Sequence, residues 1–266
     1  MVQSSPSSPP EPAAPTSQAP DVSIVLPTYC EAENLTWLVP QVSATLQSAG
    51  LSCEILVVDD ASPDGTAQVA RELSATAPVR LIERHDERGL ATAVLAGFSA
   101  ARGRCCLVMD ADGSHPISVL PRLADEVLSG RGEVAVGSRL APGGGFEDWP
   151  LWGRFKSRFA AFFAQGLTPM TDPTTGLMAV RRDLIPELDL DPVGWKIVLE
   201  VVVKAKPRPF VEVPIVFGPR QRGRSKQSLY VFFQFLRHCY RLYRYRSDSR
   251  AVAAPGARPA PRQARK

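Results

Sequence analysis

The sequence predicts an α/β fold in which a mostly parallel β-sheet is flanked by helices. Short apolar runs rich in β-branched residues alternate with stretches of helical periodicity between residues 22 and 137, and this alternation is typical of consecutive βαβ units. Hydrophobic residues make up 44% of the 266-residue chain. That content is enough for one sizeable domain with its own core, or for two small ones at most.

The first half of the chain predicts alternating strands and helices. The strands are expected at residues 22–26, 54–58, 79–83, 105–109 and 134–137. The helices are expected at residues 34–49, 66–73, 89–101 and 121–128. The third helix is rich in small residues, which favours close packing on the sheet. Pro40 interrupts the first helical pattern, so we expect that helix to begin or kink there.

The second half of the chain is less regular. The expected elements are a mobile Gly-rich loop at residues 141–150, a helix at 151–165, a turn at 171–176 and a strand at 177–180. Residues 194–204 fit a helix, although their β-branched run fits a strand equally well. Residues 210–217 predict a strand at the edge of the sheet, because Pro214 interrupts it.

The folded domain is expected at residues 21–227, between two low-complexity ends. The Ser/Pro-rich residues 1–20 and the basic Ala/Pro/Arg-rich residues 247–266 are expected to be disordered. Residues 228–246 predict an amphipathic helix with aromatic and basic side chains. This helix either lies in the headgroup region of a membrane or packs on the folded domain.

Polar residues follow three of the expected strands where each strand ends. They are Pro27, Thr28 and Tyr29 after the first strand, Asp59 and Asp60 after the second, and Asp110 and Asp112 after the fourth. The carboxyl ends of parallel strands meet at one edge of a sheet, which is where such sheets bind ligands. The sequence therefore predicts one ligand site that all three clusters share.

Asp110 and Asp112 indicate what that ligand contains. Two carboxylates directly behind a buried strand are costly unless a cation meets them. A divalent metal ion that holds a diphosphate would do so, because hard oxygen ligands suit Mg²⁺ or Mn²⁺. The alternative is a solvated turn, since Asp-x-Asp-Gly is also favourable turn chemistry.

The phosphate-binding loops of common nucleotide folds are absent from the sequence. No Gly-x-Gly-x-x-Gly follows the first strand, and there is no Gly-Lys-Ser/Thr loop. Tyr29 instead suits stacking on a base, and Glu31 or Asp60 suits hydrogen bonding to a ribose or base. The alternatives are a rim aromatic for Tyr29 and a turn or capping acid for Asp60.

Positive charge is concentrated near the C-terminus, although the net charge is only +4. Residues 220–246 contain eight Arg or Lys and no Asp or Glu, which predicts an anionic partner such as phosphate, an acidic membrane surface or nucleic acid. Arg139, Arg220 and Lys226 suit the stabilisation of a leaving group or an anionic acceptor. The alternative for all three is a solvated basic loop. His115 has no partner at metal-ligand spacing and is expected to be structural.

The sequence also predicts where the protein works. Five cysteines without framework spacing indicate a reducing compartment and no structural zinc. Residues 1–20 lack the features of a signal peptide, and no run approaches the roughly 20 apolar residues that cross a bilayer. We therefore expect a cytoplasmic chain that reaches a membrane only at its surface or through a partner.

Six sequence blocks occur in a fixed order along the chain. They are Pro27-Thr28-Tyr29-x-Glu31-x-Glu33-Asn34, Asp59-Asp60-x-Ser62-Pro63-Asp64-Gly65-Thr66, Gly89-Leu90-x-Thr92-Ala93, Asp110-Ala111-Asp112-x-x-His115-Pro116, Gly137-Ser138-Arg139 and Gly223-x-Ser225-Lys226. In these blocks the chain resembles the dolichol-phosphate (polyprenol-monophosphate) mannose synthases of the family 2 glycosyltransferases. The resemblance covers residues 22–230.

The resemblance implies a GT-A fold and an inverting transfer of mannose from GDP-mannose to a polyprenyl phosphate, with Mg²⁺ or Mn²⁺ as cofactor. It implies that the nucleotide contacts Pro27, Tyr29, Glu31, Val58 and Asp60. It implies that the metal and diphosphate contact Asp110, Ala111 and Asp112, with Ser114 where the family often has a metal-coordinating Gln. The family's phosphate-handling cations match Arg139, Arg220 and Lys226, which with Asp112 form the implied catalytic set.

Departures from the family pattern leave alternatives open. Ser114 is shorter than Gln, so we expect fewer protein ligands and more water on the metal. A UDP-sugar donor such as UDP-glucose is the alternative among transferases. The aspartate-nucleophile phosphatases share an Asp-x-Asp-Gly motif, but they place it behind their first strand. A nucleic-acid binder would need a recognised motif besides the charge, so no nucleic-acid partner is expected. Many relatives carry transmembrane helices, which makes a separate transmembrane partner the alternative to direct membrane contact.

Overall fold

The structure is a computed structural model that describes residues 19–147, 159, 161–191, 194–206, 208–220 and 229–252. Its first half contains β1 (Val22–Thr28), α1 (Ala32–Ser48), β2 (Cys53–Asp59), α2 (Thr66–Leu73), β3 (Val79–Glu83), α3 (Leu90–Ala100), β4 (Cys105–Val108), α4 (Leu120–Leu128) and β5 (Val134–Ser138). A short 3₁₀ turn, Ile117–Val119, precedes α4. Each element expected in this half is present, with its ends within two residues of the expected positions.

The second half contains β6 (Gly145–Phe146), β7 (Met178–Arg181), the 3₁₀ segment Arg182–Leu188, α6 (Ile197–Lys204), β8 (Phe210–Pro214), β9 (Val216–Phe217) and α7 (Leu229–Val252). The segment at residues 197–204 is a helix, and Ile197 to Val203 are all buried. The expectation of a loop throughout residues 141–150 is wrong at β6, which pairs with β9 in a small parallel ribbon. Most of the helix expected at 151–165 lies outside the described residues, but residues 161–164 are helical.

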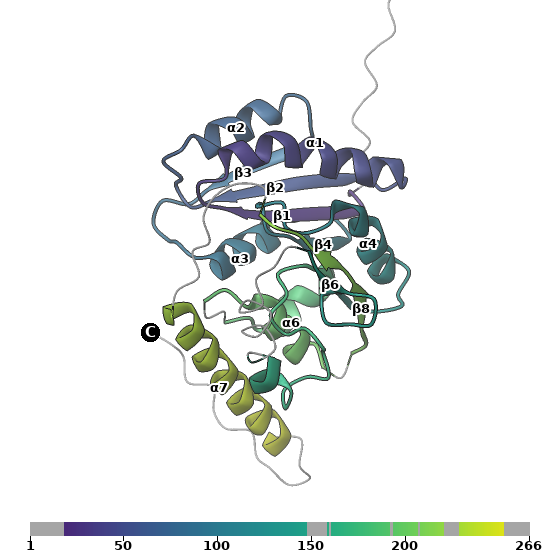
Figure 1. The fold of residues 1–266 in the computed structure, drawn as a ribbon, viewed down its shortest axis with the longest axis vertical. Coiled ribbons are helices and arrows are strands. Elements are labelled where there is room, and N and C mark those ends of the chain that lie inside the picture. Colours follow the sequence, from purple (N-terminus) through teal and green to yellow (C-terminus); the bar gives the residue numbers. More distant parts are fainter. Residues whose placement is uncertain are drawn as a thin grey trace, which may run out of the picture.

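Among the described residues the large sheet has the strand order β3-β2-β1-β4-β7-β5-β8. Figure 1 shows β3, β2, β1 and β4 in this order. The strand β7 runs antiparallel to both of its neighbours, β4 and β5, and the other pairs are parallel. The expected mostly parallel sheet is therefore confirmed. The strand that contains Pro214, β8, lies at an edge of the sheet as expected, where a missing backbone N–H does least harm.

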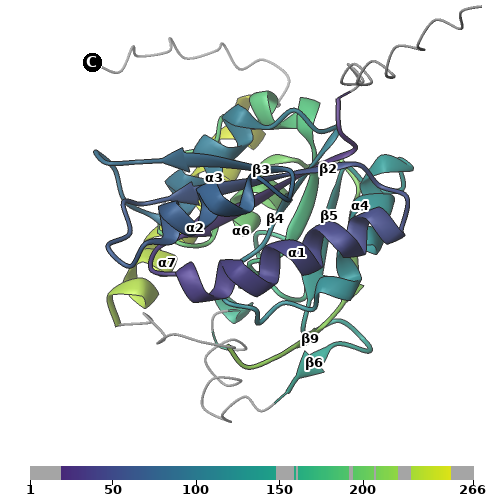
Figure 2. The same ribbon diagram turned by 90° about the horizontal axis from the view of Figure 1, so that it is seen from above.

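Helices cover both faces of the sheet, and alternate strand residues supply both cores. Ile24 and Leu26 of β1 pack in the core beneath α1, α2 and α4, whereas Val25 packs in the core beneath α3, α6 and α7. Figure 2 shows α1, α2 and α4 over one face, with α6 and α7 behind the sheet. Close packing of α3 is confirmed at Gly97, where an added Cβ would lie 2.4 Å from Val25 Cγ1.

Two helices need comment. The helix α1 runs through Pro40 from Ala32, so it does not begin at the proline, and a kink there stays a prediction. A continuous row of buried apolar residues holds the helix on the sheet and outweighs the one lost hydrogen bond. The second helix differs from the expectation. The helix α7 continues to Val252, so residues 247–252 are helical where a disordered tail was expected. No proline or glycine interrupts the chain between Leu229 and Pro255, which leaves the helix free to continue. In the described part of the chain, no helix is both long and apolar enough to cross a membrane.

Candidate active site

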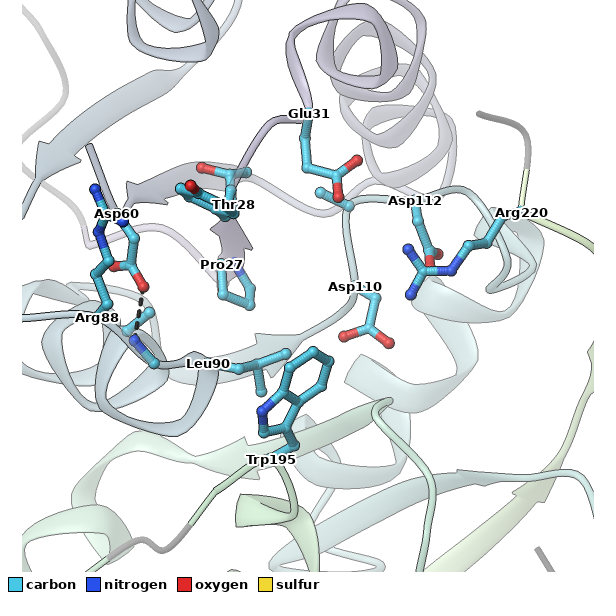
Figure 3. A pocket seen from close by; sticks show the side chains of 14 residues that line it. Pro27, Thr28, Glu31, Asp60, Arg88, Leu90, Asp110, Asp112, Trp195 and Arg220 are labelled. Carbon is cyan, nitrogen blue, oxygen red and sulfur yellow. Dashed lines mark hydrogen bonds and ion pairs between the residues drawn. The ribbon is translucent and has the colours of Figure 1, made fainter. Parts of the chain in front are cut away.

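A cavity of about 320 Å³ lies at the carboxyl ends of β1, β2 and β4 (Figure 3). Eight of the sequence-predicted site residues line it: Pro27, Tyr29, Glu31, Asp60, Asp110, Ala111, Asp112 and Arg220. The remaining lining residues are Thr28, Arg88, Gly89, Leu90, Ala93 and Trp195. The three strand ends therefore converge on one cavity, because parallel strands β2, β1 and β4 are neighbours in the sheet.

Asp112 is held by two different parts of the chain. Its Oδ1 accepts hydrogen bonds from the backbone N–H of Ser114 at 3.0 Å and from the Ser114 hydroxyl at 2.5 Å. Its Oδ2 lies 3.0 Å from Arg220 Nε. The buried Ser114 thus fixes the rotamer of Asp112, and Arg220 supplies the cation that a carboxylate behind a buried strand requires.

Asp110 is surrounded by positive or ionisable groups. His115 Nε2 lies 3.4 Å from Asp110 Oδ2, and the buried His115 ring packs edge-on against Phe217 with centroids 5.1 Å apart. Burial by itself would raise the pKa of Asp110, but His115, Lys196 and Arg220 outweigh it and hold that pKa below its usual value. Asp110 is therefore an ionised carboxylate at neutral pH.

The two carboxylates fit a divalent metal ion of the Mg²⁺ or Mn²⁺ type. Such ions often take only one or two carboxylates from the protein and complete their shell with substrate phosphates and water. Within the described residues, no group of three or more His, Cys, Asp or Glu side chains is arranged to hold a metal. Asp110 and Asp112 alone would therefore suit an ion that arrives with a diphosphate and would not suit an all-protein metal cage.

Asp60 has structural partners of its own. Its Oδ1 accepts a hydrogen bond from Arg84 Nε at 2.7 Å, and its Oδ2 accepts one from the Gly89 N–H at 2.8 Å. Asp60 thereby fixes the loop that leads into α3. A carboxylate offers about four lone-pair positions, so its predicted contact with a nucleoside stays a prediction beside this observed structural role.

Arg88 and Trp195 line the cavity but were not predicted from the sequence. The Arg88 guanidinium carbon lies 5.3 Å from the centroid of the Tyr29 ring, which places a cation over the aromatic predicted to stack on a base. The position of Arg88 directly before the Gly89-Leu90 block was a usable signal. No sequence signal indicated Trp195, because it reaches the cavity from a segment more than 80 residues beyond Asp110.

Lys196, next to Trp195, was also missed. Its Nζ donates a hydrogen bond of 2.6 Å to the Thr174 carbonyl, and its charge contributes to the low pKa of Asp110. Burial and the neighbouring Arg139 lower the pKa of Lys196 to about 8. The segment Gly194–Lys196 therefore brings an aromatic ring and a cation to the side of the cavity that holds Asp110.

Arg139 is not among the residues that line the cavity. Its Nε and Nη2 lie 2.6 and 2.7 Å from the two carboxylate oxygens of Asp172, and its guanidinium also faces the rings of Phe146 and Phe217. Burial would raise the pKa of Asp172, but Arg139 outweighs it and the pKa is lowered. The charge of Arg139 is thus neutralised by a buried carboxylate 33 residues further along the chain, a partner that no sequence spacing indicated.

Three other predicted residues also lie away from the cavity lining or cannot be placed. Val58 is fully buried in the core beneath α3, because successive residues of β2 point to opposite faces of the sheet. Ser114 is buried and bonded to Asp112. Lys226 lies outside the described residues.

Comparisons with known proteins show which family this chain matches. A family model described as glycosyl transferase family 2 matches residues 23–189. A dolichol-phosphate mannosyltransferase of Pyrococcus furiosus is 41% identical over 231 residues, which are 85% of this chain and 65% of that protein. The chain thus spans slightly less than two thirds of that relative. A dolichol-phosphate mannosyltransferase of Mycosarcoma maydis is 36% identical over 87% of this chain and 82% of its own length.

A solved structure shares the fold. The crystal structure of glucosyl-3-phosphoglycerate synthase from Mycobacterium tuberculosis, in complex with Mn²⁺, uridine diphosphate and phosphoglyceric acid, superimposes with a TM-score of 0.63. The two chains are 18% identical, and the match covers 85% of this chain and 78% of the other. This likeness shows a common arrangement of strands and helices.

Proposed function

The chain belongs to glycosyl transferase family 2 and is a glycosyltransferase with the GT-A fold, and we propose that it transfers mannose from GDP-mannose to a polyprenyl phosphate with inversion at the sugar. The main support is the cavity that brings Asp110, Asp112 and Arg220 together, in a chain 41% identical to a dolichol-phosphate mannosyltransferase. The whole reaction is stated as a proposal, because this chain covers only 65% of that relative.

The cavity suits a nucleoside diphosphate sugar in one orientation. Arg88 and Asp60 offer a cation and a carboxylate to the nucleoside at one end (Figure 3), and Tyr29, whose ring lies 5.3 Å from the Arg88 guanidinium carbon, offers an aromatic ring. Asp110, Asp112 and Arg220 gather charge at the other end, where the diphosphate would lie. Asp110 and Asp112 would hold Mg²⁺ or Mn²⁺, which when bound neutralises the diphosphate and acts as a Lewis acid on the leaving group.

The acceptor phosphate needs little activation. A phosphate monoester has its second pKa near 6 and is largely a dianion at neutral pH, so an oxygen of the phosphate is itself the nucleophile. It forms a bond to the anomeric carbon as the bond from that carbon to the GDP oxygen breaks on the opposite face, which inverts the sugar. The protein's task is to hold two anions close together, and Arg220 and the predicted Lys226 suit that task.

We propose peripheral association with the cytoplasmic face of a membrane, and the exposed face of α7 supports contact with a membrane surface. Phe233, Arg237, Tyr240 and Arg244 follow one another at helical spacing and are all exposed, and Phe233 and Tyr240 are 65% and 64% exposed. The opposite face packs on the domain through Phe235, His238, Cys239 and Leu242. The helix therefore packs on the domain with one face, and its other face carries a stripe of aromatic and basic residues that suits a headgroup region.

The decisive experiment is transfer from radiolabelled GDP-mannose to a short polyprenyl phosphate, with and without Mn²⁺. We expect metal-dependent formation of lipid-linked mannose by the unaltered chain and none by Asp112→Ala. Asp125→Ala, at an exposed position on α4, serves as the control and should remain active. Activity with UDP-glucose alone would reassign the donor, and no transfer from any nucleotide sugar would refute the proposed reaction.

A further inference from the structure

The helix α7 contacts the cavity wall through a stripe of polar side chains, of which His238 is buried. Gln234, His238, Arg241 and Tyr245 lie on one stripe of the helix at i, i+4, i+7 and i+11. In that order, the four side chains meet Gly194 and Lys196 of the wall segment Gly194–Lys196, Asp191 before it, and Lys204 at the end of α6. In Figure 1 α7 lies on the same side of the sheet as α6, and the two helices share one core.

His238 is the centre of this contact. Its side chain is only 2% exposed, and its ring is hydrogen-bonded to the backbone of Lys196. Burial lowers the pKa of His238 and that bond acts in the opposite direction, so in the bond the ring is the donor and the Lys196 carbonyl is the acceptor. The ring nitrogen Nε2 has no hydrogen-bond partner among the described residues, which leaves Nδ1 as the donor atom.

Two further contacts lie on either side of His238 along α7. One turn before His238, Gln234 lies so close to Gly194 that a Cβ on that glycine would be 3.1 Å from Gln234 Oε1. One turn after it, Arg241 forms an ion pair with Asp191. Gly194 has a φ of +72°, which favours glycine and directs the chain into the cavity at Trp195.

Glu200 of α6 connects these contacts. Its Oε1 lies 2.7 Å from Lys204 Nζ and accepts a hydrogen bond of 2.8 Å from the Asp191 N–H. Its Oε2 lies 4.0 Å from His238 Nε2. Glu200 is only 1% exposed, so this buried carboxylate joins α6 to the chain before the wall segment and lies beside α7.

From these contacts we propose that His238 is a positioning residue for the proposed transfer reaction, holding Trp195 and Lys196 in place beside Asp110 through its hydrogen bond to the Lys196 carbonyl. The kinetic part of this proposal rests on the proposed function. Its structural consequence is that α7, whose other face is exposed, and the cavity wall move as one unit.

Two substitutions at His238 separate the hydrogen bond from packing. His238→Asn keeps an N–H donor at about the position of Nδ1, whereas His238→Leu keeps an apolar side chain of similar size without a donor. Hydrogen exchange of residues 194–199 in the full chain reports how often that segment opens. We expect exchange to be roughly tenfold faster in His238→Leu and close to the unaltered chain in His238→Asn.

Transfer kinetics give the second readout. We expect the kcat of His238→Leu to fall roughly tenfold or more, because small misplacements at a reacting centre have large effects on rate, with His238→Asn restoring most of it. Cys239→Ala, a neighbouring buried substitution with no bond to the wall segment, should leave both readouts near those of the unaltered chain. Gln234→Ala should speed exchange of the same segment and provides a second variant if His238→Leu does not fold.

Equal behaviour of the Asn and Leu variants in both readouts would overturn the proposal, as would faster exchange with unchanged kcat. If the unaltered chain transfers no sugar at all, the proposed function fails. The exchange data alone then decide whether His238 holds the wall segment.

Discussion

The Nε atom of Arg220 lies 3.0 Å from Oδ2 of Asp112, and the pair joins the segment after β9 to the loop after β4. Asp112 is nearly buried, with 5% of its side chain exposed, whereas 31% of Arg220 is exposed. The cation is therefore the more accessible partner, and a bound diphosphate would compete with Asp112 for it. The pair brings the negative and the positive half of the candidate site into contact.

Loss of Arg220 is expected to impair the reaction more than the fold. We expect Arg220→Ala to lower kcat/KM about ten- to a hundredfold, the range for hydrogen bonds to charged groups of about 1.5–3 kcal/mol. The thermal midpoint should change little, because the arginine is partly exposed. Arg131→Ala removes an arginine that is 50% exposed and paired with acids on α4, and it should retain full activity. Activity of Arg220→Ala within twofold of the unaltered chain would exclude Arg220 from the site.

A methyl group at Gly176 is expected to disturb Asp110. An added Cβ there would lie 2.9 Å from Asp110 Oδ2, so the carboxylate must shift. We expect Gly176→Ala to raise the Mn²⁺ concentration needed for half-maximal transfer roughly tenfold, as for other changes behind a metal ligand. Gly145→Ala is the matched control, because an added Cβ there meets nothing within 4 Å. An unchanged metal requirement in Gly176→Ala would argue against Asp110 as a ligand.

The Arg139–Asp172 pair is expected to matter for stability. Asp172→Ala leaves the buried Arg139 without its carboxylate, and loss of one partner of a buried pair typically costs about 3–5 kcal/mol in the free energy of unfolding. We expect urea unfolding to show a loss of this size. The double variant Arg139→Met with Asp172→Leu should recover most of it, because neither charge then remains buried. A double variant as unstable as the single one would show that the pair contributes more than neutralisation.

Asp172 also predicts a dependence of stability on acid pH. Its pKa is lowered in the folded state, so the folded protein binds fewer protons than the unfolded chain, whose value is about 3.9. The stabilisation is therefore complete above about pH 4 and is lost as pH falls through the folded pKa. We expect Asp172→Asn to flatten the acid limb of a stability–pH curve. The limb should not vanish, because the pKa values of Glu54 and Asp64 are lowered as well. An unchanged slope would contradict the assignment.

Exposed aromatics of α7 are expected to govern membrane binding. Burial of a large apolar side chain contributes about 1.5–3 kcal/mol, so Phe233→Ser with Tyr240→Ser should weaken co-sedimentation with anionic vesicles at least tenfold. Val216→Ser, which changes an exposed apolar residue on β9, should bind as the unaltered chain does. Equal binding of all three proteins would show that this face of α7 does not contact lipid.

Several parts of the site could be read from the sequence because they depend on short-range chemistry. Asp110 and Asp112 follow a buried strand directly, and Tyr29 and Asp60 end neighbouring strands of the same sheet. Once alternating strands and helices indicate a parallel sheet, these residues must share one edge. Their convergence on one cavity follows from the order of the elements alone.

Other features depend on partners far apart in the chain. Val58, which is predicted to contact the nucleotide, is fully buried in the core, and Arg139, which is predicted to handle phosphate, is paired with Asp172. Both roles stay predictions, and only the folded chain places Arg139 and Asp172 together. Trp195 lines the cavity and Lys196 interacts with Asp110, although the segment that carries both follows Asp110 by more than 80 residues.

The sequence by itself determined the α/β class, the extents of the elements from β1 to β5, and the cluster of strand-end residues, since these depend on hydrophobic periodicity, strand ends and turn residues within a few positions. Only the tertiary structure decided which cations face the cavity, which are neutralised elsewhere, and that α7 contacts the cavity wall through His238. A charge acts on whatever lies within a few ångströms of it, and for Arg139, Lys196 and His238 those neighbours come from distant parts of the chain.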